Sequence, residues 1–200
     1  MRVESMPHDL SGFEGESLGL LLFEGDLDGI SCLGDLAPEV RSRVELERFT
    51  GKKESLIKAT FPDGRIKRVI LVGLGKREKA TPDTFRTGAA LIVKEATKSG
   101  AASLALATPT APDALISQAL TEGALLGSYS FDRYRSKKDE PETKIEQVLV
   151  AGGDEGALKR GALFACGQNY ARDLANEPAN VINPLTFSGE AQKVAKEVGL

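Results

Sequence analysis

Residues 54–75, ESLIKATFPDGRIKRVILVGLG, contain the clearest signals for the fold of this protein. The turn signal Pro62-Asp63-Gly64 separates two aliphatic runs, so the stretch predicts two strands joined by a tight turn. The run 69–72 is apolar without alternation, which is typical of a strand buried on both faces of its sheet. Such a strand is covered on each side by other elements, and this favours an α/β fold.

Strand-like and helix-like segments alternate on both sides of this stretch, which is the pattern of an α/β domain. Further strands are predicted at residues 17–26, 102–108 and 146–152, and helices at 36–49, 81–100, 111–129, 154–176 and 186–200. Helix 81–100 has clear boundaries, because Thr81 can cap it, Pro82 suits its first position and Gly100 ends it. The helical period places on one face of it Phe85, Ala89, Ile92 and Ala96, and on one face of helix 111–129 Ile116, Leu120, Ala124 and Gly127.

The longest predicted helix covers residues 154–176 and starts with two acidic residues, which suit the positive end of a helix dipole. Residues at the helical period along it are Leu163, Cys166, Tyr170 and Leu174. Small residues that would permit close packing are Gly161, Ala162, Ala165 and Gly167. The densely charged segment 131–147 before the last strand is interpreted as an exposed loop.

Composition excludes several classes of protein. The 200 residues carry a formal net charge of -3, which disfavours non-specific nucleic-acid binding. The apolar run 18–23 is too short for a signal core or a membrane span, so we expect neither, and we expect a cytoplasmic protein. The two cysteines, Cys32 and Cys166, lie in unrelated contexts and are expected to be reduced thiols.

The chain contains a single histidine, His8, in a polar amino-terminal segment. A histidine-rich zinc site is therefore impossible, and the HExxH motif is absent. A Ser-His-Asp or Cys-His mechanism would depend on His8 alone, which we interpret as a solvated surface residue.

The motif that most resembles a phosphate-binding loop is VILVGLGKRE, residues 69–78. It has Gly73 and Gly75 after a buried strand, but Glu78 stands where a dinucleotide fingerprint has its third glycine. A P-loop requires Ser or Thr after Gly-Lys, and Arg77 follows here. The favoured interpretation is a glycine turn that leaves a central strand.

Two further segments resemble a phosphate or anion site less closely and are also interpreted as structural. The segment 49–55 pairs Gly with Lys but lacks the rest of a phosphate motif, and acidic residues in the segment 151–157 would oppose an anion. Acidic residues elsewhere are interspersed with Lys and Arg, so no segment resembles a metal-binding strand end. The residues alone predict an α/β domain without a visible active site.

The connector, which we define as residues 169–184, NYARDLANEPANVINP, carries a family resemblance. Pro178 is expected to end one helix, and Asn183 and Pro184 to cap and begin the next. The connector resembles the segment that joins the two domains of the leucyl aminopeptidase (cytosol aminopeptidase) family, close to ARDL-x-N-x-P-x-N-x-x-x-P. The matching residues are Ala171, Arg172, Asp173, Leu174, Asn176, Pro178, Asn180 and Pro184. Segments 21–26, 67–76 and 122–138 and the helix from Leu158 follow in the family's order.

The resemblance implies a macro-domain-like mixed sheet flanked by helices over residues 1–152, and over 153–200 a long linker helix with the start of a catalytic domain. In the family, the catalytic domain binds two divalent ions, manganese or zinc, through motifs similar to VGKG-x-x-FDSGG and NTDAEGR. Neither motif occurs in this sequence. No catalytic, cofactor-binding or metal-binding residue of the family is therefore carried over to any position here. The chain is expected to be an inactive amino-terminal portion of a longer aminopeptidase.

Other readings stay open beside this one. The family resemblance implies homo-hexamers that act on peptides, so the chain could be an assembly or regulatory module. Some bacterial members bind DNA, which the acidic balance of this chain does not support. ADP-ribose binding is disfavoured, because the loops of macro domains that bind it have no match here and a shared fold does not transfer a ligand. A free-standing α/β domain with only ancestral resemblance is the third reading. The last helix is expected to be poorly packed, because the partner surface that a catalytic domain would supply is absent.

Overall fold

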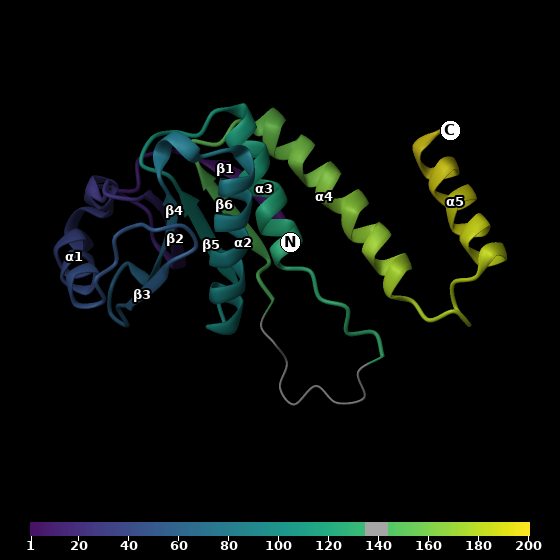
Figure 1. Cartoon of the computed structure of the whole chain (residues 1–200), viewed down its shortest axis with the longest axis horizontal. Coiled ribbons are helices and arrows are strands. Elements are labelled where there is room, and N and C mark those ends of the chain that lie inside the picture. Colours follow the sequence, from purple (N-terminus) through teal and green to yellow (C-terminus); the bar gives the residue numbers. More distant parts are fainter. Residues whose placement is uncertain (135–143) are drawn as a thin grey trace.

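The computed structural model describes residues 1–134 and 144–200 and contains a six-stranded mixed sheet with helices on both faces (Figure 1). The strands are β1 Arg2–Met6, β2 Gly15–Phe23, β3 Leu56–Thr60, β4 Ile66–Gly75, β5 Ser103–Ala107 and β6 Gln147–Ala151. The helices are α1 Ala37–Leu46, α2 Pro82–Lys98, α3 Ala114–Gly127, α4 Glu155–Asn176 and α5 Pro184–Val198, with 3₁₀ turns η1 Asp28–Leu36 and η2 Arg77–Lys79.

The strand order is β1-β6-β5-β2-β4-β3, and β3 runs antiparallel to β4 while the other pairs of this sheet are parallel. The predicted pair of strands in the stretch 54–75 is confirmed as the hairpin β3–β4, closed by the turn around Gly64. The apolar run of β4 is fully buried, with Val69, Ile70 and Val72 at 0% exposure. The run lacks alternation because both of its faces are covered, as the sequence pattern predicted.

Each face of the sheet has its own core. Alternation along β2 sends Leu21 to one face and Leu20 and Leu22 to the other. The first face packs against α2 and α3, and the predicted buried residues of α2 all lie in that core: Phe85, Ala89, Ile92 and Ala96. The second face packs against η1 and α1 through Ile30, Leu33, Leu36, Val40 and Val44. On α3, Leu120 and Ala124 are buried as predicted.

The glycines that follow the central strand are explained by backbone packing. A Cβ at Gly73 would lie 2.0 Å from the carbonyl oxygen of Lys52, so a side chain is excluded there. Gly75 has a φ of 76°, and its N–H donates to the carbonyl of Gly51. The glycine pattern of residues 69–78 therefore lets the segment before β3 approach β4, and the interpretation as a structural turn is supported.

The amino-terminal strand was not anticipated from the sequence. Residues Arg2–Met6 form β1, which pairs in parallel with β6 and extends the sheet. His8, expected to be solvated, is instead half-buried, and its Nε2 lies 3.1 Å from the backbone carbonyl of Thr108. The expectation failed because β1 brings the residues after it against the β5 end of the sheet.

Helix α4 packs on the domain through the small residues predicted to allow close packing, and the larger residues at the helical period do not all face the domain. Gly161 and Ala165 are buried, and a Cβ at Gly161 would lie 2.7 Å from the carbonyl oxygen of Gln118 on α3. Leu163 is 72% exposed and Cys166 is exposed, so the predicted larger residues do not face α3. A Cβ added at Gly167 would meet no atom within 4 Å, so this glycine plays no part in the packing. The small residues form the contact because α3 and α4 approach closely.

The helix boundaries around the connector are as predicted. Helix α4 ends at Asn176, before Pro178, and Asn183 caps α5 by accepting hydrogen bonds from Leu185 and Thr186. None of the residues of α5 is buried, and Gly199 ends the helix in a left-handed conformation. The expectation that the last helix is poorly packed agrees with this. Part of the segment 131–147, interpreted as an exposed loop, lies outside the described residues, at 135–143.

None of the helices in residues 1–134 and 144–200 is long and apolar enough to cross a membrane.

Candidate functional site

A metal centre was sought first. Within the described ranges, no group of three or more His, Cys, Asp or Glu side chains is arranged to hold a metal ion. The buried acidic residue Glu122 and the exposed helix cap Asp154 both have other partners. Glu122, with a side chain 10% exposed, pairs with Arg86 at 2.7 Å, and Asp154 caps α4 by accepting from the N–H of Ala157. The part of the chain that the structure describes therefore offers no ligand set for the two divalent ions that the family resemblance places in a catalytic domain.

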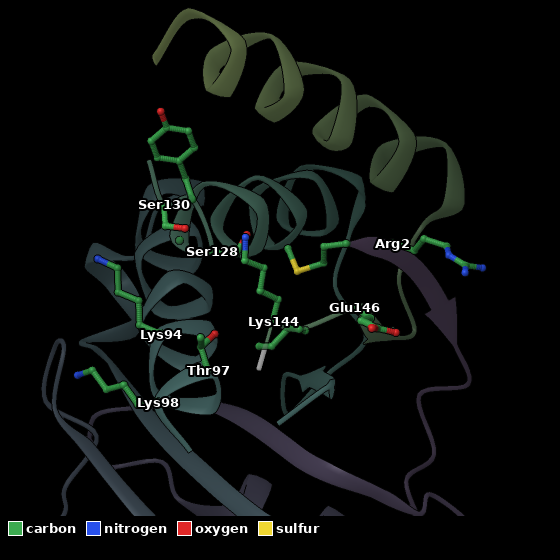
Figure 2. Close-up of a pocket in the computed structure, with 12 residues that line it drawn as sticks. Arg2, Lys94, Thr97, Lys98, Ser128, Ser130, Lys144 and Glu146 are labelled. Atoms are coloured by element: carbon green, nitrogen blue, oxygen red, sulfur yellow. The ribbon is translucent and has the colours of Figure 1, made fainter. Parts of the chain in front are cut away.

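A hollow of about 680 Å³ is bordered by cationic residues (Figure 2). It lies where α2 and α3 end and where β1 and β6 begin. Figure 2 shows Lys94 and Lys98 extending to one side of it and Arg2 to the other, with Lys144 between them. Lys98 lies in the last turn of α2, and it stabilises that helix because helix carboxyl ends carry partial negative charge. The charged groups diverge, so the described residues around the hollow do not form an anion site.

A smaller hollow, of about 210 Å³, lies at the carboxyl ends of β2 and β5, the edge where open α/β sheets usually bind ligands. Its polar groups already have partners. Arg77 lies 4.2 Å above the Phe23 ring and donates to Asp26 at 2.5 Å, while Thr108 donates to the carbonyl of Thr110. With its Arg paired in this way, the hollow offers, among the described residues, no convergent set of free polar groups for a ligand.

The most specific polar arrangement lies instead at the end of α4, and we call it the connector clamp. It joins the segment after α3, through Tyr129, Arg133 and Tyr134, to the end of α4, through Arg172, Asp173, Asn176 and Glu177. These two segments are separated by about forty residues of sequence. The contacts therefore fix the carboxyl end of α4 to the α/β domain.

Tyr129 is the centre of the clamp. Its hydroxyl donates to Asp173 at 2.9 Å and accepts from the Asn176 side chain at 3.0 Å. The guanidinium of Arg172 lies 5.0 Å from the centre of the Tyr129 ring and donates to the carbonyl of Leu126 at 3.3 Å. One tyrosine thereby uses its hydroxyl and its ring to hold three residues of the last turn of α4.

Glu177 forms the second half of the clamp. Its carboxylate accepts hydrogen bonds from Arg133 and from the Tyr134 hydroxyl, and its side chain is only 3% exposed. A carboxylate enclosed to this degree needs such donors, because an unpaired buried charge is strongly unfavourable. Glu177 is also the residue after α4, so the clamp holds the helix at its terminus.

All three tyrosines of the chain donate a hydrogen bond to a carboxylate in this region. The third, Tyr170 of α4, donates to Glu190 of α5 at 2.7 Å. Burial and the hydrogen bond to Asp173 raise the pKa of Tyr129. The hydrogen bonds to Glu177 and Glu190 raise the pKa values of Tyr134 and Tyr170. Because the chain has no tryptophan, its tyrosine spectrum reports on this region alone.

Sequence reasoning assigned the connector to stopping and restarting a helix, and it missed the clamp. Pro178, Asn183 and Pro184 have that role, but Arg172, Asp173 and Asn176 of the same pattern contact Tyr129. The sequence did contain a signal, because the end of this helix has more charged and amide residues than are needed to end a helix. Their partners lie in a distant segment, and spacing alone could not identify them.

Comparison with known proteins places these features in a family. Residues 32–138 match the family model described as the cytosol aminopeptidase family, N-terminal domain. A probable cytosol aminopeptidase of Aquifex aeolicus is 40% identical over 203 residues, covering 100% of this chain and 41% of its own length. A probable cytosol aminopeptidase of a Sulfurihydrogenibium species is 34% identical, covering 100% of this chain and 42% of its own. The chain therefore spans about two-fifths of the length of these relatives.

Solved structures agree on the fold. A tomato leucine aminopeptidase mutant superposes with a TM-score of 0.84 over 98% of this chain and 42% of its own, at 23% identity, which is a likeness of fold alone. The bottromycin maturation enzyme BotP, solved in complex with Mn, has a TM-score of 0.73 and 27% identity over 92% of this chain and 37% of its own. The six-stranded mixed sheet with its flanking helices is thus the architecture seen in these larger proteins.

Proposed function

The chain belongs to the cytosol aminopeptidase family, whose N-terminal domain it matches, and we propose that it is the non-catalytic part of a two-domain metallo-aminopeptidase. In this proposal, residues 1–152 form the amino-terminal domain, and residues 153–200 lead into a catalytic domain. The whole enzyme would be cytoplasmic, would form homo-hexamers and would release amino-terminal residues from peptides.

The observation that carries the proposal is the pair of uncovered apolar faces on α4 and α5. Leu163 is 72% exposed on α4, and on α5 Leu185 and Phe187 are 85% and 53% exposed. Figure 1 shows both helices extending from one side of the sheet and its flanking helices. Large apolar residues concentrated on helix faces that the rest of the chain leaves uncovered mark an interaction surface. A following domain, in relatives more than twice as long, would cover it.

The chemistry of the proposed enzyme belongs to that following domain. Two divalent ions, manganese or zinc, would polarise the scissile carbonyl and activate a water molecule. The Mn in the BotP structure supports the choice of ion for the family, and the described residues of this chain offer no cluster to hold one. The contribution of this chain is to support and orient the domain that holds the ions.

Hydrolysis of leucine-p-nitroanilide with added manganese tests the proposal. The purified 200-residue chain should give no turnover, whereas the full-length Aquifex aeolicus relative should turn over under the same conditions. Turnover by the chain itself would contradict its assignment as non-catalytic. Light scattering separates the alternative, a free-standing assembly module: a stable hexamer of this chain alone would favour that module instead.

A further inference from the structure

The clamp contacts are concentrated where packing ends. The first half of α4 is held by buried small residues and one leucine, namely Ala157, Leu158, Gly161 and Ala165. Beyond Ala165 no residue of α4 is buried. Residues on one side of the last turns are half-buried, but a helix without fully buried apolar residues is marginal in water, so these turns need another source of stability. Polar contacts replace the packing there: Asn169 donates to the carbonyl of Leu125 at 3.2 Å, and the clamp follows from Arg172 onward.

We infer that Tyr129 and Tyr134 are positioning residues that fix the end of α4, and so set the direction in which the chain leaves the amino-terminal domain. Each tyrosine lies on the short segment that follows α3 and reaches a carboxylate on or next to the last turn of α4. The pair holds the helix end from two points, which restricts both fraying and swinging. In the proposed two-domain enzyme, the clamp would also set the orientation of the catalytic domain, and this last step rests on the proposed function.

The flexible point then lies after the clamp and not within α4. Between Glu177 and α5 the chain makes a turn in which Val181 and Ile182 both donate to the carbonyl of Pro178. A side-chain tie from α5 back to α4 is the Tyr170–Glu190 hydrogen bond. In this inference the hinge is therefore confined to residues 178–183, which lie between the clamped Glu177 and the start of α5 at Pro184.

Distance measurement between two spin labels tests the inference in the full chain. Both native cysteines are first removed by Cys32→Ser and Cys166→Ser. One label is placed by Leu46→Cys at the end of α1, where the side chain is 73% exposed. The other is placed by Ala171→Cys, which is exposed and in the second half of α4. The inference predicts one narrow distance distribution for this pair.

Three variants give matched outcomes. Tyr129→Phe combined with Tyr134→Phe removes both hydroxyls while it keeps the rings, and it should replace the narrow distribution with a broad one. Tyr170→Phe removes a tyrosine hydroxyl from α4 itself, outside the clamp, and it should leave the narrow distribution unchanged. Glu177→Gln keeps the shape of the side chain but removes its charge. It should also broaden the distance distribution, as the double variant does.

The circular-dichroism spectrum and the urea midpoint of the α/β domain confirm that each variant is folded. A narrow distribution in the folded double variant would overturn the inference, as would equal broadening by Tyr170→Phe. These outcomes concern the orientation of α4 alone. The inference about the clamp and the proposal about the peptidase can therefore fail separately, because the latter is tested by turnover and the former by distance.

Discussion

The contact between α3 and α4 leads to a prediction that compares two glycines of one helix. Gly161→Ala places a methyl group 2.7 Å from the carbonyl oxygen of Gln118 and 2.9 Å from the Cβ of Thr121. Gly167→Ala places the same group in open space, with nothing within 4 Å. Both changes gain helix propensity of about 1 kcal/mol, because alanine loses less backbone entropy than glycine in a helix.

The propensity gain is common to the two variants and cancels in their difference. Gly161→Ala must also push α4 from α3, and overpacking of this kind costs roughly 1–3 kcal/mol. We therefore expect Gly167→Ala to raise the free energy of unfolding by up to about 1 kcal/mol. The free energy of unfolding of Gly161→Ala should be about 1–3 kcal/mol lower than that of Gly167→Ala.

Urea unfolding followed by circular dichroism measures this difference directly, provided that the slope with urea is the same in both variants. In thermal unfolding, 1 kcal/mol corresponds to roughly 2–4 °C in Tm for a chain of this size. Equal stabilisation by the two alanines would refute the packing of α4 on α3. So would a loss of stability in Gly167→Ala alone.

Three further predictions follow from other contacts. Arg65→Met should lower the free energy of unfolding by on the order of 3 kcal/mol, because the side chain is 16% exposed and its guanidinium donates to three backbone carbonyls. Arg41→Met, at an exposed pair with Ser31, should be nearly neutral by the same urea assay. The raised pKa values of Tyr129 and Tyr134 mean that their clamp contacts stabilise the fold fully below pH ~10, the usual tyrosine pKa, and that this stabilisation is lost as pH rises through the folded values. The same holds for the contact of Tyr170 with Glu190 outside the clamp, so phenolate absorbance should titrate at higher pH in the native chain than in urea. At neutral pH, a thiol reagent should modify the exposed Cys166 before Cys32, whose pKa is raised chiefly by burial, and equal rates would contradict this.

The central part of the fold could be predicted from sequence because its signals are local. The β3–β4 hairpin follows from a turn motif between apolar runs, and α2 from its cap and its period of buried residues. Glycines at the end of β4 were recognised as structural because their neighbours did not fit a phosphate motif. In each case, the residues that determine the element lie close together in the sequence.

The features that were missed depend on distant partners. Strand β1 has only five residues, and it is stabilised by pairing with β6, 145 positions further along the chain. The period of larger residues on α4 suggested a packing face, but the close approach of α3 selects the face with Gly161 instead. The clamp joins Tyr129 to Asp173 across 44 positions, and neither segment indicates its partner.

Amide hydrogen exchange along α4 and α5 will show whether the clamp fixes the end of α4 and leaves the hinge after it. The amides of residues 172–176 should exchange as slowly as those near Gly161, although their side chains are not buried. Those of α5, which has no buried residue, should exchange much faster. Exchange that becomes steadily faster from Asn169 towards Asn176, and that does not change in Tyr129→Phe, would contradict the claim.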